Sequence, residues 1–91
     1  MHKKTVYLIL KGRVQGVGFR YFIKQRAEEL QISGWARNAP DGKVEIEAEG
    51  EPRNLETFID WIKIGPSRAV IQSVSVSEIS PVRNFTSFII R

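Results

Sequence analysis

The chain has 91 residues, of which 42% are hydrophobic and 26% charged, an ordinary globular composition that argues against disorder and low-complexity sequence. The absence of cysteine excludes disulfides, zinc–thiolate sites and thiol catalysis, and the absence of an apolar run approaching about 20 residues excludes a membrane-spanning helix. The net charge of +4 divides into +6 over residues 1–40 and −2 over residues 41–91, so the basic half either faces an anionic partner (a phosphate compound, nucleic acid or a membrane surface) or only keeps the protein in solution.

The first part of the chain predicts a strand, a helix and a second strand. Thr5 to Lys11 is rich in β-branched and aromatic residues, which is typical of a strand. A helix is predicted from about residue 20 to 31, because apolar residues recur there at helical spacing. These residues are Phe19, Ile23, Ala27 and Leu30. Ser33-Gly34 interrupts the pattern, and Trp35 to Arg37 predicts a short strand.

The second part predicts a turn, a strand, a helix and one or two further strands. The turn Pro40-Asp41-Gly42 precedes a strand in which apolar residues alternate with Glu45, Glu47 and Glu49. We expect the glutamates to form an acidic, solvated face of this strand rather than a metal site. A helix begins at Pro52 and ends at Gly65-Pro66. Val70 to Ile79 predicts the next strand, and Phe85 to Ile90 suggests a short last one.

The order of these elements is β-α-β-β-α-β, with a possible extra strand at the end. It indicates an α+β, ferredoxin-like sandwich, in which an antiparallel sheet carries two helices on one face. No linker, repeat or biased segment divides the chain, so we expect one domain over residues 1–91. The first residues lack the apolar core and cleavage site of a secretion signal, which favours a cytoplasmic protein.

A glycine-rich segment lies between the first strand and the first helix. Gly12, Gly16 and Gly18 allow backbone N–H groups to converge on one point, and the following helix adds its N-terminal partial charge. Arg20 could offer a fork of donors to one anion. These features suggest a phosphate cradle, while the alternative is a structural turn beside a surface arginine. The segment fits neither a Walker A loop nor a dinucleotide fingerprint, since it ends Gly18-Phe19-Arg20 and has Tyr21 where a third small residue is needed.

The segment Gly12 to Arg20, with the sequence GRVQGVGFR, resembles the signature of the acylphosphatase family. A second signature of that family resembles Gly34-Trp35-Ala36-Arg37-Asn38, followed by Pro40-Asp41-Gly42. The similarity continues through Glu49-Gly50 and Gly65-Pro66-Ser67 to the closing residues 88–91. The resemblance therefore extends over nearly the whole chain.

This resemblance implies hydrolysis of carboxyl-phosphate mixed anhydrides to carboxylate and phosphate. It assigns phosphoryl binding to Arg20 and to the backbone amides of Gln15, Gly16, Val17, Gly18 and Phe19. It assigns Asn38 the positioning of the attacking water. It implies no metal, no cofactor and no covalent intermediate. The expected partners are a small-molecule acyl phosphate and inorganic phosphate, without nucleic acid or membrane, and the expected state is a monomer.

The chain departs from the family pattern at Gln31, where relatives often have glycine. A left-handed conformation of Gln31 would lower the stability of the fold by about 1 kcal/mol.

Two other functions remain open from the residues alone. One is an RNA-binding module of the same fold, although the glutamate row on the best candidate strand would repel phosphates. The other is a carrier-like or regulatory domain that binds a phosphorylated acid without turnover. Several single residues have plain explanations: His2 is expected to be incidental, and Trp35 and Trp61 to be core or half-buried aromatics. Asn84-Phe85-Thr86 matches a glycosylation sequon that we expect to be unused.

Overall fold

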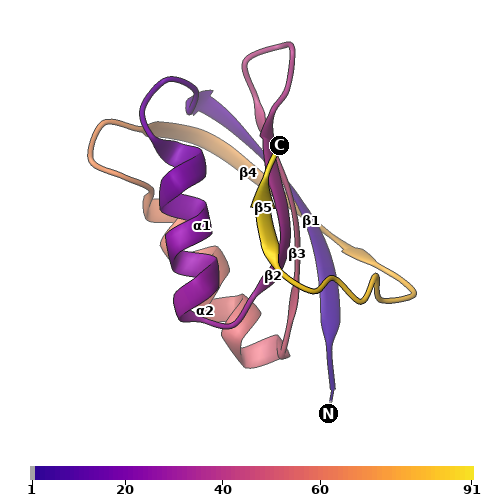
Figure 1. Ribbon diagram of the computed structural model, residues 1–91. Coiled ribbons are helices and arrows are strands. Elements are labelled where there is room, and N and C mark those ends of the chain that lie inside the picture. The colour runs from indigo at the N-terminus through magenta and orange to yellow at the C-terminus, as the bar shows by residue number, and fades with distance from the viewer. Residues whose placement is uncertain (1) are drawn as a thin grey trace.

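The computed structural model describes residues 2–91 and contains five strands and two helices. In chain order they are β1 (Lys4–Arg13), α1 (Phe19–Glu29), β2 (Ser33–Asn38), β3 (Val44–Gly50), α2 (Pro52–Ile64), β4 (Val70–Ile79) and β5 (Phe88–Ile90). The strands form one sheet in the order β4-β1-β3-β2-β5, and both helices cover the same face of it (Figure 1). The predicted ferredoxin-like order of elements is confirmed.

The sheet is mixed rather than antiparallel throughout. β1 pairs antiparallel with β3 and β4, and β2 pairs antiparallel with β3. The extra strand β5 instead pairs parallel with β2, with Gly34 opposite Phe88 and Ala36 opposite Ile90. β5 can therefore reach this edge only after the chain has crossed from β4 at the other edge of the sheet.

The core lies between the helices and the covered face of the sheet. Alternate residues of β1 and β3 point into it, because successive side chains of a strand alternate between faces. The helices contribute residues at helical spacing, and each large apolar side chain buried in this way stabilises the fold by roughly 1.5–3 kcal/mol. The fully inaccessible members include Leu8, Leu10, Ile23, Val44, Ile46, Phe58 and Ile62. Neither helix in residues 2–91 is long and apolar enough to cross a membrane.

Several predicted boundaries differ from the structure. β1 and β2 each extend one or two residues beyond their predicted ends, so β2 includes Ser33 and Gly34. Two other differences have identifiable reasons. α1 ends at Glu29 because Gln31 takes a left-handed conformation with φ 56°, and the Ile32 N–H then closes the helix on the Ala27 carbonyl at 2.8 Å. The last strand begins at Phe88 instead of Phe85. The Phe85 N–H donates to a side chain, the carboxylate of Glu49, rather than to a neighbouring strand.

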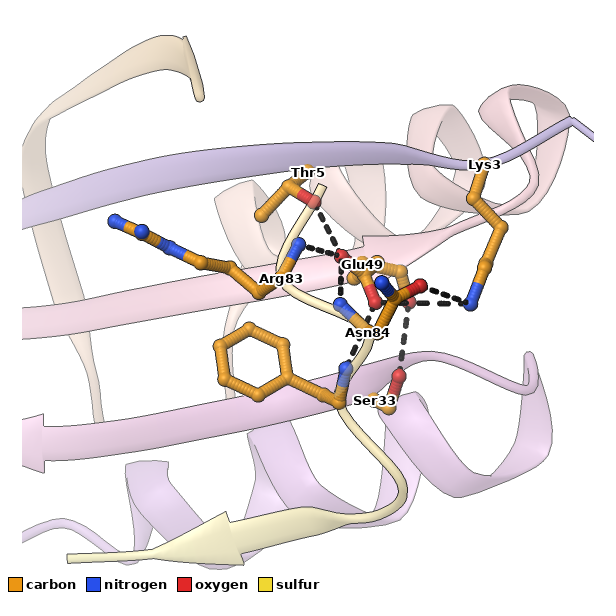
Figure 2. Close-up of polar contacts among 7 residues, drawn as sticks. Lys3, Thr5, Ser33, Glu49, Arg83 and Asn84 are labelled. Carbon is orange, nitrogen blue, oxygen red and sulfur yellow. Dashed lines mark hydrogen bonds and ion pairs between the residues drawn. The ribbon is translucent and has the colours of Figure 1, made fainter. Parts of the chain in front are cut away.

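The prediction of a solvated glutamate face is wrong for Glu49 and only partly right for its neighbours. Glu49 is fully buried, because the connection between β4 and β5 passes over it (Figure 2). The side chains of Glu45 and Glu47 are only 17% and 15% exposed, and they pair with arginines. These partners are Arg37 for Glu45 and Arg83 for Glu47. Arginines elsewhere in the chain thus cover the glutamates that the alternating pattern predicts to be solvent-exposed.

The two tryptophans differ from one another. Trp35 is buried, 8% exposed, as expected, with the Arg91 guanidinium 4.4 Å from the centre of its ring. Trp61 is 45% exposed, which agrees with the expectation of a core or half-buried aromatic. The Arg26 guanidinium of α1 lies 5.5 Å from the centre of its ring, a contact between the two helices.

Candidate active site

The glycine-rich segment forms a loop, residues 14–18, whose two ends are anchored in the core. Val14 and Phe19 are each 1% exposed, whereas Gly16 and Gly18 between them are exposed. Both glycines have positive φ, 72° and 74°, and open space lies where a Cβ would be. The backbone conformation, and not crowding, therefore requires glycine at these positions.

The N-terminus of α1 follows the loop directly. Gly18 is the N-cap, so no side chain caps the first turn, and the first turn contains no acidic residue. The N–H groups at the start of a helix lack intrahelical partners and carry a partial positive charge. In most helices a Ser, Thr, Asp or Asn side chain binds them. In α1 these donors are left for an external anion.

A cavity of about 180 Å³ lies against this loop and the first turn of α1. Gly16, Gly18, Phe19 and Arg20 line one side of it, and Asn38 at the end of β2 lines it as well. Val14 and Tyr21 complete the lining. Figure 1 shows why these segments meet, since the β1–α1 loop and the β2–β3 hairpin lie at the same end of the sheet. The volume is smaller than the roughly 300–1,000 Å³ of pockets for drug-sized ligands, so it suits a small anionic group better than a nucleotide.

Five of the seven predicted site residues line this cavity, and two do not. The exceptions are Gln15 and Val17, whose side chains hold the loop in place instead of lining the cavity. Val17 packs against the hydrophobic core. The Gln15 amide donates to the Ala39 and Lys43 carbonyl oxygens at 2.8 and 2.9 Å. Gln15 thereby ties the loop to the hairpin that carries Asn38.

This role of the Gln15 side chain was missed by sequence reasoning, which used only its backbone amide. The one available signal was chemical, because Gln15 is the only residue of 14–18 with a hydrogen-bonding side chain. Its acceptors lie 24 and 28 residues further along the chain, so no local pattern identifies them.

Arg20 is held by the end of the sheet's edge strand. Its Nη1 donates to the Arg91 carbonyl oxygen at 2.9 Å, and the Arg91 N–H in turn donates to Ala36 of β2 at 2.8 Å. No Asp or Glu side chain within residues 2–91 forms an ion pair with Arg20. A guanidinium has five N–H donors, so most of those of Arg20 remain free for a ligand.

Comparison with known proteins identifies the family. A sequence model of the acylphosphatase family matches residues 6–90. The chain belongs to the acylphosphatase family. It is 46% identical over 82 residues to an acylphosphatase of Marinobacter nauticus, which covers 90% of this chain and 89% of that protein. Its membership of this family makes the chain a hydrolase of the acylphosphatase type.

Solved structures agree with this assignment. The crystal structure of the Bacillus subtilis acylphosphatase superposes with a TM-score of 0.94 at 38% identity, covering 97% of this chain and 98% of that one. Full-length HypF, solved in a phosphate- and nucleotide-bound form, contains a similar unit with a TM-score of 0.93 at 34% identity. That match covers 99% of this chain but 12% of HypF.

Two basic residues near the second acylphosphatase signature, Arg37 and Lys43, form ion pairs. Arg37 lies in β2, and its Nε is 2.5 Å from the Glu45 carboxylate. The Tyr7 hydroxyl also donates to Glu45. This hydrogen bond, followed by the contact with Arg37, holds the pKa of Glu45 below its ordinary value despite partial burial. Lys43 pairs with Asp41 at 2.8 Å. Arg20 instead lines the cavity.

The described residues 2–91 contain no cluster of three or more His, Cys, Asp or Glu side chains arranged to hold a metal ion. The polar groups that line the cavity are an arginine, an asparagine and backbone amides. This donor set suits an oxyanion, because each of these groups can donate hydrogen bonds to it.

Proposed function

We propose that this chain hydrolyses acyl phosphates, R–CO–O–PO₃²⁻, to a carboxylate and inorganic phosphate by direct attack of water. The observation that carries the proposal is the single small cavity lined jointly by Arg20, the uncapped start of α1 and Asn38. It offers both a place for a phosphoryl group and a neutral side chain beside that place. Family membership supports the same reaction class.

The phosphoryl group is bound by charge and by oriented backbone donors. Arg20 offers a planar fork of N–H groups to two phosphoryl oxygens. The amides of the loop from Gln15 to Phe19 and the N-terminal dipole of α1 bind the remaining oxygens. Because these donors are held before substrate arrives, they stabilise the charge that develops on the equatorial oxygens without reorganisation.

Asn38 positions the attacking water. A neutral amide is suited to this role because its oxygen accepts a hydrogen bond from the water while its NH₂ can donate one. The water oxygen forms a bond to phosphorus, and the bond between phosphorus and the acyl oxygen breaks. The electron pair of that bond leaves with the carboxylate, and the water proton is taken up by the phosphate product. A carboxylate is a good leaving group, so positioning and electrostatics suffice without a covalent intermediate, metal or cofactor.

We further propose that the chain acts as a monomer and does not use nucleic acid as its partner. Arg20, the glycine loop and Asn38 meet within one copy, so the proposed site needs no residue from a second copy. On the open face of the sheet, Tyr7 and Trp35 already have partners within the protein. The Tyr7 hydroxyl is hydrogen-bonded to Glu45, and the Arg91 guanidinium covers the ring of Trp35. Base stacking on such strands needs free aromatic faces. The cytoplasmic location stays a prediction from the sequence.

The test is hydrolysis of benzoyl phosphate by the purified protein in the presence of a chelator. We expect rapid turnover by the wild type and a loss on the order of 10²-fold or more in rate for Arg20→Ala and for Asn38→Ala, as for other removed transition-state donors. Arg53→Ala and Asn54→Ala are matched controls in α2, beyond the opposite end of β3. They should keep wild-type rates.

The outcomes separate the alternatives. Full activity in Asn38→Ala would contradict the water-positioning role, and full activity in Arg20→Ala would contradict the phosphoryl-binding role. A wild type that binds inorganic phosphate at the loop without any turnover would favour a phosphate-recognising module over an enzyme.

A further inference from the structure

The buried carboxylate of Glu49 is a polar group that the proposed mechanism does not use. It is fully inaccessible to solvent and lies on the central strand β3. In the β2–β3 ladder, Glu49 is opposite Ser33 at one end, whereas Val44 is opposite Asn38 at the other end. Glu49 therefore lies at the end of the sheet far from the cavity. Burying a carboxylate is costly unless it is fully hydrogen-bonded.

Most of these partners are backbone N–H groups of the connection between β4 and β5, residues 80–87, which we call the strap. Oε2 accepts from the N–H groups of Arg83 at 2.6 Å and Asn84 at 3.1 Å, and Oε1 accepts from Phe85 at 2.9 Å. Three consecutive amides thus converge on one carboxylate (Figure 2). Such a run of amides in a turn forms a concave anion site within the protein itself.

Two side chains from the N-terminal part of the chain complete the site. The Thr5 hydroxyl donates to Oε2 at 2.5 Å. The Lys3 Nζ lies 3.9 Å from Oε1 and donates to the Asn84 side chain at 3.2 Å (Figure 2). The Arg83 guanidinium turns to Glu47 instead. Both carboxylate oxygens of Glu49 are therefore satisfied, mainly by the strap.

The strap leads directly to the group that holds Arg20. Its last residue, Ser87, accepts a hydrogen bond from the Gly34 N–H at 2.9 Å, and β5 follows beside β2. Arg91 comes directly after β5, and its carbonyl oxygen accepts the hydrogen bond from Arg20. One short segment is thus bound by Glu49 at its start and by Arg20 at its end.

β5 is a short edge strand with few anchors. It is three residues long, pairs on one side only, and Ile89 is 48% exposed. Only Phe88 enters the core, where its ring lies 6.3 Å from that of Phe58, and its carbonyl oxygen accepts a hydrogen bond from Lys24 Nζ at 3.0 Å. Ordering each residue of an edge segment costs conformational entropy. The anchors on either side of Phe88 therefore contribute to how well the position of Arg91 is defined.

We propose that Glu49 is a positioning residue for the active site: by binding the amides of the strap it fixes β5, and with it the carbonyl oxygen that orients Arg20. This inference rests on the proposed function, because it assigns the orientation of Arg20 a role in phosphoryl binding. It makes Glu49, at the far end of the sheet from the cavity, a determinant of phosphate affinity.

The test compares Glu49→Gln with Thr5→Val. The glutamine places an NH₂ group where one carboxylate oxygen accepted strap amides, so donors face each other and the strap loosens. Thr5→Val removes a hydrogen bond to the same carboxylate but leaves all three strap amides bound. Both variants lose stability, and only the first releases the strap. Measurements are made at a temperature where circular dichroism shows every variant folded.

The readouts are the inhibition constant of inorganic phosphate, kcat and KM for benzoyl phosphate, and amide hydrogen exchange at Ile90 and Arg91. For Glu49→Gln we expect phosphate binding weakened on the order of 3- to 10-fold, within the range by which remote residues change a site's affinity, with faster exchange at both amides. For Thr5→Val we expect phosphate affinity close to wild type. Should Glu49→Gln not fold, Glu49→Asp keeps the charge but is too short to reach all three amides, and the same result is expected.

Equal weakening of phosphate binding in Glu49→Gln and Thr5→Val would reduce Glu49 to a general stabilising residue and overturn the proposal. So would faster exchange in β5 with unchanged phosphate affinity. Failure of the proposed function looks different, because the wild type itself would then not turn over benzoyl phosphate while the effects of Glu49→Gln on phosphate binding and exchange could still be present.

Discussion

Gln31 adopts a conformation that its side chain disfavours. Its φ of 56° lies in the left-handed region, where a Cβ is crowded against the backbone. The conformation is retained because it ends α1, allowing the Ile32 N–H to bond back to Ala27 and turn the chain into β2. Gln31 itself is exposed, so no packing contact compensates for the strain.

We expect Gln31→Gly to raise the free energy of unfolding by about 1 kcal/mol, because glycine removes the steric cost of this conformation. Urea denaturation followed by circular dichroism measures the change. The matched control is Gln25→Gly at an exposed position inside α1, which should lower stability by about 1 kcal/mol. Destabilisation by both substitutions to a similar extent would show that the left-handed turn is not strained.

The β1–α1 loop and the β2–β3 hairpin form the cavity only if they keep their relative positions. The ends of the loop are anchored in the core by Val14 and Phe19, but this packing does not by itself fix the loop relative to the hairpin. The Gln15 side chain joins them through the Ala39 and Lys43 carbonyl oxygens on either side of the turn. Under the proposed mechanism the loop binds the phosphoryl group and Asn38 in the hairpin positions the water, so this link would set the separation between phosphorus and that water.

Gln15→Ala should therefore impair chemistry more than binding. We expect kcat to fall on the order of 10-fold or more, since small misplacements of a positioned group cost up to about 10²-fold. The inhibition constant of inorganic phosphate should change much less, because Arg20 and the loop amides remain. Steady-state kinetics with benzoyl phosphate measures both, with Gln72→Ala on the exposed edge of β4 as the control. A variant with unchanged kcat would show that the hairpin holds Asn38 without this link.

The basic and acidic halves of the sequence occupy different parts of the molecule. The basic half, residues 1–40, contains the strand, loop, helix and second strand that form the cavity. The acidic half contributes β3, whose glutamates face arginines and backbone amides on the open side of the sheet. The carboxylates of β3 are thus paired on the open side of the sheet and do not line the cavity.

This arrangement makes stability depend on pH. Burial raises the pKa of Glu49, but hydrogen bonds from Thr5 and from the amides of Asn84, Arg83 and Phe85 outweigh it, so its pKa lies below the ordinary value of 4.5. A carboxyl group with a lowered folded-state pKa binds fewer protons in the folded than in the unfolded chain. Its contribution is present above the unfolded pKa and is lost as pH falls through the folded pKa.

We therefore expect the free energy of unfolding to decrease as pH falls below about 4.5, near the pKa of a glutamate in an unfolded chain. Urea denaturation between pH 3 and pH 6 tests this directly. Glu49→Gln should be less stable at pH 6 and show a shallower decrease towards pH 3. The Lys3 ammonium group faces the same carboxylate. A wild-type stability that does not change below pH 4.5 would contradict the prediction.

Local patterns were enough to predict the order of elements and the loop of the site. Strand alternation and helical spacing depend on neighbouring residues, so they located β1, α1, β3 and α2 closely. The glycines and Arg20 lie within nine residues, Gly12 to Arg20, and their resemblance to the acylphosphatase signature named a function that the family comparison supports. Local patterns failed at Glu49, whose alternation with apolar residues predicts exposure.

By itself, the sequence determined the chemistry available at the loop, the order of strands and helices, and the family, because each depends on residues close together in the chain. Only the tertiary structure decided that β5 runs parallel beside β2, that Gln15 reaches the Ala39 and Lys43 carbonyls, and that the strap buries Glu49. Each of these joins groups between 24 and 54 residues apart. Such pairings depend on which surfaces the folded core brings together, and no local periodicity records them.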